Sequence, residues 1–488
     1  MGEKSLKQKA TAGMVWTALS KYSTTAIAFV SGIILARLLT PHDYGCIGLL
    51  GIFMSLASTF IGAGFGTALI QKKTPTQTDY STIFFWNMGM AVVMYVILFF
   101  SAPAIAAFYR IPLLCPVLRV QAFVLIINAF NLVQRSQLRK QLKFSVLSKV
   151  SIATSFLSLA VTIIMAYRGF GVWSLVTQNL LAAAIPALVF WFYVGWRPLL
   201  IFSWKSFREL FSFGAYILLS NIVNTFGTEI QGLMIGKLFN ASTLGYYSKA
   251  AGAEQMASYS ISGVITSVSF PLYAEAQDDK VMLGNIIRRL TMTISYITFP
   301  FMLLLLTLGK PLFVLLYSER WLPSVIYFQV LCLVGISSCL QAVNTQSIAA
   351  IGKSKQMFSW ILVKRVLGVC AMIIGLVLYG MKGFLVGVVF YNYFCYFVNI
   401  GLVSKYIGYK WNDQLKDLMP VALVSLVALA VCNVSVLFHL NMFVEGAIKL
   451  VVFLLVYMGW SLVFKPEAYT YTLTLIPERF KFWKRNIE

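Results

Sequence analysis

Charged residues are scarce in this sequence. Only 11% of its 488 residues are Asp, Glu, Lys or Arg, whereas an ordinary globular domain has about 25%. Apolar residues make up 59% of the chain, and its mean hydropathy is +0.81. Because so few polar side chains cannot cover a surface that faces water, a soluble globular protein is excluded. The lipid bilayer is therefore the expected solvent of this chain.

The residue types that metal sites and disulfides need are scarce as well. The chain has two histidines and seven cysteines, and the cysteines form no CxxC motif. The cysteines lie within or beside apolar segments, which is typical of packing residues rather than of disulfides or metal ligands. The sequence therefore predicts no metal site and no cofactor.

Large extramembrane segments and paired carboxylates are also missing. No internal loop exceeds about 18 residues, whereas a membrane glycan polymerase or ligase usually holds its chemistry in a larger loop. General acid–base catalysis needs paired titratable groups in one cleft. Within the apolar segments the acidic residues are only Glu229, Glu254 and Glu445. We therefore expect a protein that is not an enzyme and has no catalytic residues.

Long apolar runs dominate what is present. A run of about 20 apolar residues crosses a hydrocarbon core roughly 30 Å thick, and it must do so as a helix. The sequence predicts an all-α integral membrane protein of about fourteen transmembrane helices. We expect these helices at residues 12–37, 45–70, 81–108, 114–138, 145–167, 171–194, 210–236, 244–270, 287–316, 324–350, 358–379, 383–407, 416–438 and 442–464.

Positive charge gives the expected orientation. About 28 of the 39 Lys and Arg lie in the N-terminal tail, the even-numbered loops with their flanks, and the C-terminal tail, which by the positive-inside rule places both termini in the cytoplasm. Only about seven lie in odd-numbered loops. The net charge of +23 then reflects contact with anionic lipid headgroups. No compact basic domain exists, so nucleic acid is not an expected partner.

An internal repeat indicates two parallel lobes. At an offset of 200 residues, Gly45 matches Gly245, and Arg37 matches Lys237 at the same place in the corresponding span. An even number of spans per copy makes the copies parallel, with a substrate path between them. We expect a six-helix lobe over residues 1–200, a second six-helix lobe over 201–410, two additional helices over 411–464, and a basic cytoplasmic tail over 465–488.

Polar residues inside the expected helices mark candidates for a wet cavity. A charge in the membrane is costly and usually faces a partner or water, and Lys21 lies about 13 Å into the first helix. Four of the cations can instead extend to the lipid headgroups: Arg37, Lys237, Lys364 and Arg365. Glu254 can instead pair with a basic residue in a purely structural role. The polar candidates are Lys21, Thr24, Arg119, Asn128, Asn131, Asn221, Asn224, Glu229, Gln231, Lys249 and Glu254.

Small residues in the apolar runs favour close helix packing. Gly232 and Gly236 form one such pair, and Gly383 and Gly387 form another. The GAGFG run at 62–66 is similar to a phosphate-binding loop, but its spacing is wrong and no strand precedes it. We expect that run to lie inside a helix and to serve packing.

Several motifs in this chain resemble the polysaccharide transporter family, the Wzx-type lipid-linked oligosaccharide flippases of the multidrug/oligosaccharidyl-lipid/polysaccharide exporter superfamily. The motifs are LARLLTPHDYG at 35–45, GFGTALIQ at 64–71, VQR at 133–135, LKF at 142–144 and GFGVWSLV at 169–176. The resemblance covers nearly the whole chain. It implies two six-helix lobes around a central cavity, extra C-terminal helices, and alternating access between the two leaflets.

The resemblance also implies a substrate: an oligosaccharide on a polyprenyl diphosphate, flipped across the bacterial cytoplasmic (inner) membrane for O-antigen, capsule or exopolysaccharide synthesis. Membrane lipids and other polysaccharide assembly proteins are the further partners it implies. A diphosphate is anionic, so Lys21, Arg119 and Lys249 become candidates for the anion pathway. The candidates for the cavity lining become Thr24, Asn128, Asn131, Asn221, Asn224 and Gln231. Glu229 or Glu254 becomes the candidate for cation coupling.

Two other transporters remain open as alternatives, besides the membrane glycan polymerase or ligase that would need the larger loop. A multidrug/cation antiporter would share the fold, but its branch generally carries an acidic residue deep in the first span, where this chain has Lys21. A flippase for a peptidoglycan precursor differs chiefly in its substrate.

Overall fold

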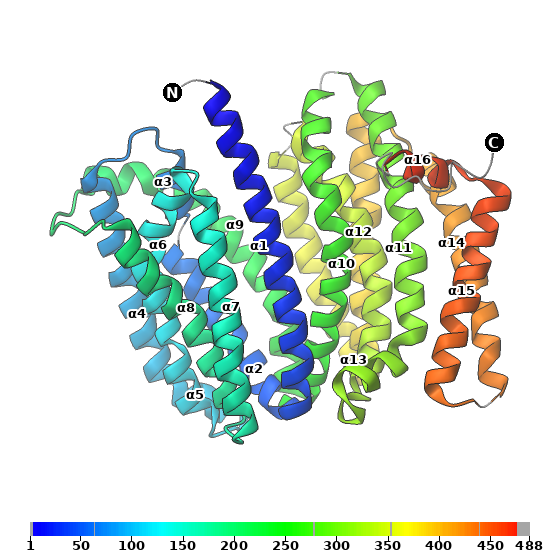
Figure 1. The fold of residues 1–488 in the computed structure, drawn as a ribbon, viewed down its shortest axis with the longest axis horizontal. Helices are drawn as coiled ribbons and strands as arrows, with labels where there is room; N and C mark the ends of the chain where they lie inside the picture. The colour runs from blue at the N-terminus through cyan, green and yellow to red at the C-terminus, as the bar shows by residue number, and fades with distance from the viewer. Residues whose placement is uncertain (1–2, 63, 277–278, 352–353, 439, 476–488) are drawn as a thin grey trace. The chain divides into compact units, whose positions relative to one another are not determined.

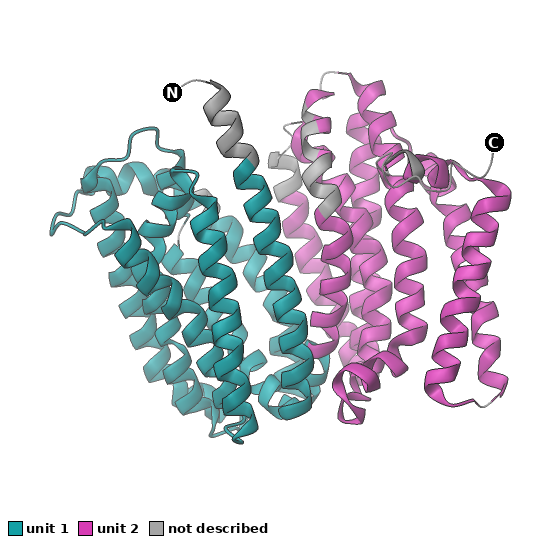
Figure 2. Ribbon diagram, in the orientation of Figure 1, with its two compact units in different colours: residues 1–248 teal, residues 249–488 magenta. Residues whose placement is uncertain are grey.

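The computed structural model describes residues 3–62, 64–276, 279–351, 354–438 and 440–475, and all regular structure in these residues is helical (Figure 1). The all-α fold class predicted from the apolar runs is confirmed. By contacts the chain divides into two compact units, residues 1–248 and residues 249–488 (Figure 2).

Unit 1 is a bundle of long helices with two short ones. In it α1 packs against α7, α2 against α9, and α6 against both α4 and α8. Its helices are α1 (Glu3–Leu38), α2 (Pro41–Gly62), α3 (Phe65–Gln71), α4 (Gln77–Tyr109), α5 (Leu114–Gln121), α6 (Phe123–Lys140), α7 (Phe144–Tyr167), α8 (Val172–Val194), α9 (Trp204–Leu238) and the first turns of α10 (Ala241–Glu275).

Unit 2 is organised around α11, which packs against α12, α14, α15 and α16. A continuous apolar core joins these helices, with Tyr296, Phe453 and Tyr457 among its buried side chains. Besides the rest of α10, its helices are α11 (Lys280–Tyr317), α12 (Ser324–Ala350), α13 (Ser354–Ile407), α14 (Trp411–Asn433), α15 (Met442–Phe464) and α16 (Glu467–Leu475), with short 3-10 turns at Glu319–Trp321 and Val434–Phe438.

Eleven helical segments in the described residues are long and apolar enough to cross a membrane. One of them runs from Ser359 to Ile407, which at 1.5 Å per residue is more than twice the thickness of a hydrocarbon core. It breaks at Tyr379 and Gly380, where Gly380 has a positive φ of 58°, and the sequence predicts two spans there. Helices α9 and α10, parts of which lie outside the searched residues, are not among the eleven, so the count of about fourteen stays a prediction.

The GAGFG run at 62–66 does not lie inside one helix, as expected from its apolar context. Helix α2 ends at Gly62, and α3 begins at Phe65. Gly64 between them has φ 73°, a left-handed conformation that glycine adopts without strain. A Cβ on Gly62 would meet nothing within 4 Å. Gly64 therefore allows the chain to break between α2 and α3. The prediction that Gly62 serves close packing is wrong.

Close packing is confirmed at other glycines. A Cβ on Gly383 would collide with the backbone carbonyl of Gly375, and one on Gly387 would collide with that of Ala371. These contacts hold the two halves of α13 together. A Cβ on Gly236 would collide with the Leu49 side chain across the α2–α9 contact. The small residues predicted at these sites thus allow helices to approach closely.

The repeat appears as a reciprocal contact at the start of α2 and α10. A Cβ on Gly45 would overlap the carbonyl oxygen of Ala241, and a Cβ on Gly245 would overlap that of Pro41. At the offset of 200, Gly45 corresponds to Gly245 and Pro41 to Ala241. Matching residues thus make matching contacts, as in a two-fold symmetric interface.

The two compact units divide at residue 248 rather than at the expected lobe boundary of 200. Helix α9 packs against α2, α3 and α4, so it is grouped with unit 1. The predicted lobes over 1–200 and 201–410 therefore stay predictions. Helices α14 and α15 occupy the segment expected for two additional helices, 411–464. Of the expected basic tail, 465–488, residues 476–488 lie outside the described residues.

Candidate functional site

A small polar cluster lies between α2 and α9 in unit 1. We call Ser55, Thr59, Thr225 and Glu229 the α2–α9 polar cluster. The Ser55 hydroxyl donates to Glu229 Oε1 at 2.9 Å, and the hydroxyl oxygens of Thr59 and Thr225 are 3.1 Å apart. These contacts join residues more than 160 positions apart in the sequence.

Glu229 lies well inside α9 in this cluster. It is nine residues before the end of α9 at Leu238, a distance of about 13 Å along the helix. Gly51 makes room for it, because a Cβ there would lie 3.3 Å from Glu229 Oε2. A carboxylate has about four acceptor positions, and one hydroxyl donor fills only part of them. The half-buried Glu229 therefore keeps acceptor positions open to a further polar or positively charged group.

The other sequence candidates on α1 and α9 differ in their surroundings. Lys21 is exposed on α1, and the half-buried Thr24 donates its hydroxyl back to the carbonyl of Ser20 at 2.7 Å. On α9, Asn221 and Asn224 are exposed. Gln231 accepts a 2.7 Å hydrogen bond from the Tyr247 hydroxyl.

The candidates on α5 and α6 do not join the cluster through any hydrogen bond or ion pair between described residues. The Arg119 guanidinium stacks 4.2 Å from the centre of the Phe99 ring and donates from Nε to the Phe99 carbonyl at 3.3 Å. Asn128 is exposed. Asn131 is only 2% exposed, and its Oδ1 has no hydrogen-bond partner among the described residues.

The two candidates in unit 2 are both buried on α10. Lys249 is 9% exposed, and its ammonium lies 4.2 Å from the centre of the Tyr317 ring, a favourable cation–π contact. Glu254 is 6% exposed and accepts a hydrogen bond from the Ser258 hydroxyl. It faces α12 at Gly335, where a Cβ would collide with Glu254 Oε1. The glycine on α12 therefore makes room for the carboxylate.

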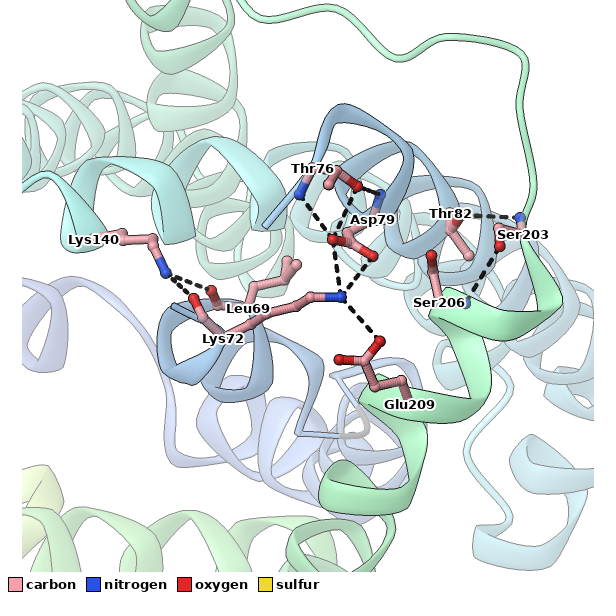
Figure 3. Close-up of polar contacts among 9 residues, drawn as sticks. All are labelled: Leu69, Lys72, Thr76, Asp79, Thr82, Lys140, Ser203, Ser206 and Glu209. Carbon is pink, nitrogen blue, oxygen red and sulfur yellow. Dashed lines mark hydrogen bonds and ion pairs between the residues drawn. The ribbon is translucent and has the colours of Figure 1, made fainter. Parts of the chain in front are cut away.

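A second polar network, not expected from the sequence, ties together four segments of unit 1 (Figure 3). Lys72 bonds Asp79 at 3.1 Å and Glu209 at 3.0 Å. Asp79, only 1% exposed, also closes a capping box with Thr76 at the start of α4. Lys140 from the end of α6 donates to the carbonyl of Ile70 in the last turn of α3 and to that of Lys72, which follows α3. Four segments thus share one charged network.

Burial lowers the pKa of Lys72, but its hydrogen bonds to Glu209 and Asp79, together with their charges, outweigh burial and raise the pKa above its ordinary value. Lys72 therefore stays charged at neutral pH. The segment between α8 and α9 is held to the same end of α4, because the Leu199 amide donates to Ser81 and the Ser203 amide to Thr82. The T-x-x-D pattern at 76–79 was the one sequence signal for this network.

No group of three or more His, Cys, Asp or Glu side chains in the described part of the chain could hold a metal ion. The polar groups of the membrane helices are hydroxyls, amides, a few carboxylates and a few cations. Such groups can bind and release polar or charged ligands. Together with the long apolar helices, they define a multi-pass integral membrane protein with polar sites at membrane depth.

The chain belongs to the polysaccharide biosynthesis protein family, whose model matches residues 34–326. Among curated relatives, the teichuronic acid biosynthesis protein TuaB of Bacillus subtilis is 27% identical over 358 residues, which cover 73% of this chain and 74% of that protein. The family membership predicted from the sequence motifs is confirmed.

Solved structures show the same fold. The lipid II flippase MurJ in an inward closed conformation matches with a TM-score of 0.72 and 14% identity, covering 92% of this chain and 98% of MurJ. An inward-facing multidrug resistance transporter of the MATE family matches with a TM-score of 0.60 and 16% identity, covering 82% of this chain and 95% of that one. At such low identities these likenesses concern the fold alone.

Proposed function

We propose that this chain is a flippase that moves polyprenyl-diphosphate-linked oligosaccharides across the bacterial cytoplasmic membrane by alternating access. The glycan would be a precursor of O-antigen, capsule or exopolysaccharide. The observation that carries the proposal is membership of a polysaccharide biosynthesis family on a fold that a lipid II flippase shares. The bias of Lys and Arg toward the even-numbered loops supports cytoplasmic termini.

The polar residues of the membrane helices have complementary parts in this proposal. Lys21, Arg119 and Lys249 supply positive charge to the anionic diphosphate. The hydrogen-bonding groups for the sugars come from Thr24, Asn128, Asn131, Asn221, Asn224 and Gln231. Glu229, with its hydroxyl donor and spare acceptor positions, is the stronger candidate for cation coupling. Glu254 is the second candidate, since it is buried more deeply against α12.

Replacement of Lys21 by alanine is expected to reduce glycan export without loss of membrane insertion. The side chain is exposed on α1, so its removal leaves no buried group unpaired. Loss of one charge-assisted hydrogen bond to the diphosphate should weaken binding by about tenfold or more. The measurement is surface glycan per cell at matched protein levels. Lys205→Ala, which removes an exposed lysine at the start of α9, is the control, and unchanged export in Lys21→Ala would remove Lys21 from the pathway.

The proposal as a whole is tested by deleting the gene in its own host. Lipid-linked oligosaccharide should then accumulate on the cytoplasmic leaflet, and surface glycan should fall. Restoring the gene should reverse both effects. Normal surface glycan in the deletion strain, with no accumulated precursor, would argue against the proposal.

A multidrug/cation antiporter is the second candidate. The MATE-type fold and the carboxylates within α9 and α10, Glu229 and Glu254, favour it. In that case deletion should raise sensitivity to lipophilic cations and leave the glycan intact. The two candidates therefore give opposite results in the same strain.

A further inference from the structure

A basic cavity of about 550 Å³ lies in unit 1 at the end of α4 and the turn between α9 and α10. Its basic lining residues are His42, Arg110 and Lys237, and its lining contains no Asp or Glu. All three belong to segments that the charge bias places on the outer side of the membrane. The cavity is separate from the α2–α9 polar cluster, none of whose residues line it.

Lys237 is fixed at this cavity. Its ammonium donates to the Phe108 carbonyl at 2.8 Å and lies 3.6 Å from the centre of the Phe108 ring. An ammonium has three donors, so two remain for a ligand. A cation held in place by its own neighbours loses little conformational freedom when an anion binds.

Arg110 occupies a backbone position at which glycine would be less strained. It ends α4 in a left-handed conformation, with φ 57° and ψ 37°, and its amide bonds the carbonyls of Ala106 and Ala107. Its exposed guanidinium makes no hydrogen bond or ion pair with any residue that the structure describes. The side chain is therefore free to engage a ligand with its planar set of donors, a geometry suited to phosphate.

Tyr109 supplies a further observation that points to a ligand. It lines the cavity and is only 8% exposed. Its hydroxyl has no hydrogen-bond partner among the described residues. A buried hydroxyl without a partner is costly, and an oxygen of a bound anion would satisfy it. The start of α10, at Ala241 and Ser242, adds the positive end of a helix dipole to the same lining.

We propose that this cavity binds a phosphate or diphosphate group at the outer ends of α2, α4 and α9. The proposal rests on the proposed function, for which the cavity is a second anion site, on the side where the glycolipid is released. Two cations, one of them fixed, one hydroxyl and no carboxylate match the chemistry of a phosphoryl group. An anionic lipid headgroup presents the same chemistry, and the test below separates the two sources.

The test is binding of inorganic pyrophosphate to the full chain in zwitterionic nanodiscs, measured by calorimetry at constant ionic strength. Wild type should bind, and Arg110→Gly should bind about ten- to a hundredfold more weakly, because one charge-assisted set of hydrogen bonds is lost. Glycine suits the left-handed position, so this variant should fold at least as well as wild type. Arg110→Gly with Lys237→Gln should bind more weakly still. Arg168→Gln, which removes an exposed arginine outside the cavity, should bind like wild type.

Equal binding by wild type and Arg110→Gly, or no binding by wild type, would overturn the proposal. Nanodiscs that contain phosphatidylglycerol identify the source. Weaker pyrophosphate binding in these nanodiscs would show that phosphatidylglycerol competes for the cavity and would assign it to a lipid headgroup. Undiminished pyrophosphate binding would assign the cavity to the phosphates of the transported lipid. Flipping by wild type is assayed separately. Intact flipping with equal binding in the variants would therefore reject this cavity and leave the proposed function standing.

Discussion

Glu229→Gln is expected to lower the rate of glycan translocation by about tenfold or more, because an amide cannot take up a proton or hold a cation as a carboxylate does, and each 1.4 kcal/mol of lost coupling is about a factor of ten. Glutamine keeps an acceptor for the Ser55 hydroxyl, so the α2–α9 contact should persist. Only the capacity to take up a proton or cation is removed. The measurement is the initial rate of translocation in proteoliposomes under an imposed ion gradient.

Glu319→Gln is the matched control for Glu229→Gln. Glu319 is exposed on the short 3-10 turn after α11, and its side chain makes no hydrogen bond or ion pair with the described residues. Its replacement should leave the translocation rate unchanged. A rate for Glu229→Gln equal to that of wild type at every imposed gradient would remove Glu229 from the coupling step, and Glu254→Gln would then become the variant to measure.

Gly45→Ala is expected to destabilise the protein by about 1–3 kcal/mol, the typical cost of overpacking a closed contact. The new Cβ would overlap the carbonyl oxygen of Ala241, a backbone atom that cannot rotate away. Helix propensity alone predicts the opposite sign, since alanine is favoured over glycine by about 1 kcal/mol. The measurement is the midpoint of thermal unfolding in detergent.

Gly252→Ala is the control for Gly45→Ala, because a Cβ at Gly252 on α10 would meet nothing within 4 Å. It should unfold at the same temperature as wild type or above it. Gly245→Ala should be destabilised like Gly45→Ala, because its Cβ would overlap the Pro41 carbonyl. The double variant should lose less than the sum of the two, since both changes act on one contact. An unchanged midpoint in both single variants would contradict the reciprocal contact.

Much of the fold could be predicted from the sequence, because lipid permits few structures. Apolar runs gave the helices, and the two predicted spans at 358–379 and 383–407 meet at the observed break, Tyr379–Gly380. The offset of 200 paired Gly45 with Gly245, and these residues pack reciprocally. The family motifs were likewise sufficient to identify the family. Three of them, at 35–45, 142–144 and 169–176, lie at turns and helix ends.

The candidate site was less predictable, because its contacts join residues far apart in the chain. Glu229 was a candidate, but nothing in the sequence indicated Ser55 as its partner. The Lys72 network was missed for the same reason, since Asp79 and Glu209 approach Lys72 from α4 and α9. Arg119 shows a further limit. Its guanidinium stacks on the ring of Phe99, a contact that nothing in the sequence indicated.

The most direct measurement uses the purified chain in liposomes that carry a fluorescent polyprenyl-diphosphate oligosaccharide in both leaflets. A membrane-impermeant glycosidase added outside digests only the glycan that reaches the outer leaflet. The account predicts that liposomes with the protein lose nearly all of the glycan, whereas protein-free liposomes keep the inner-leaflet fraction. Equal digestion in the two preparations, with the protein folded and inserted, would contradict the central claim that this chain flips lipid-linked oligosaccharides.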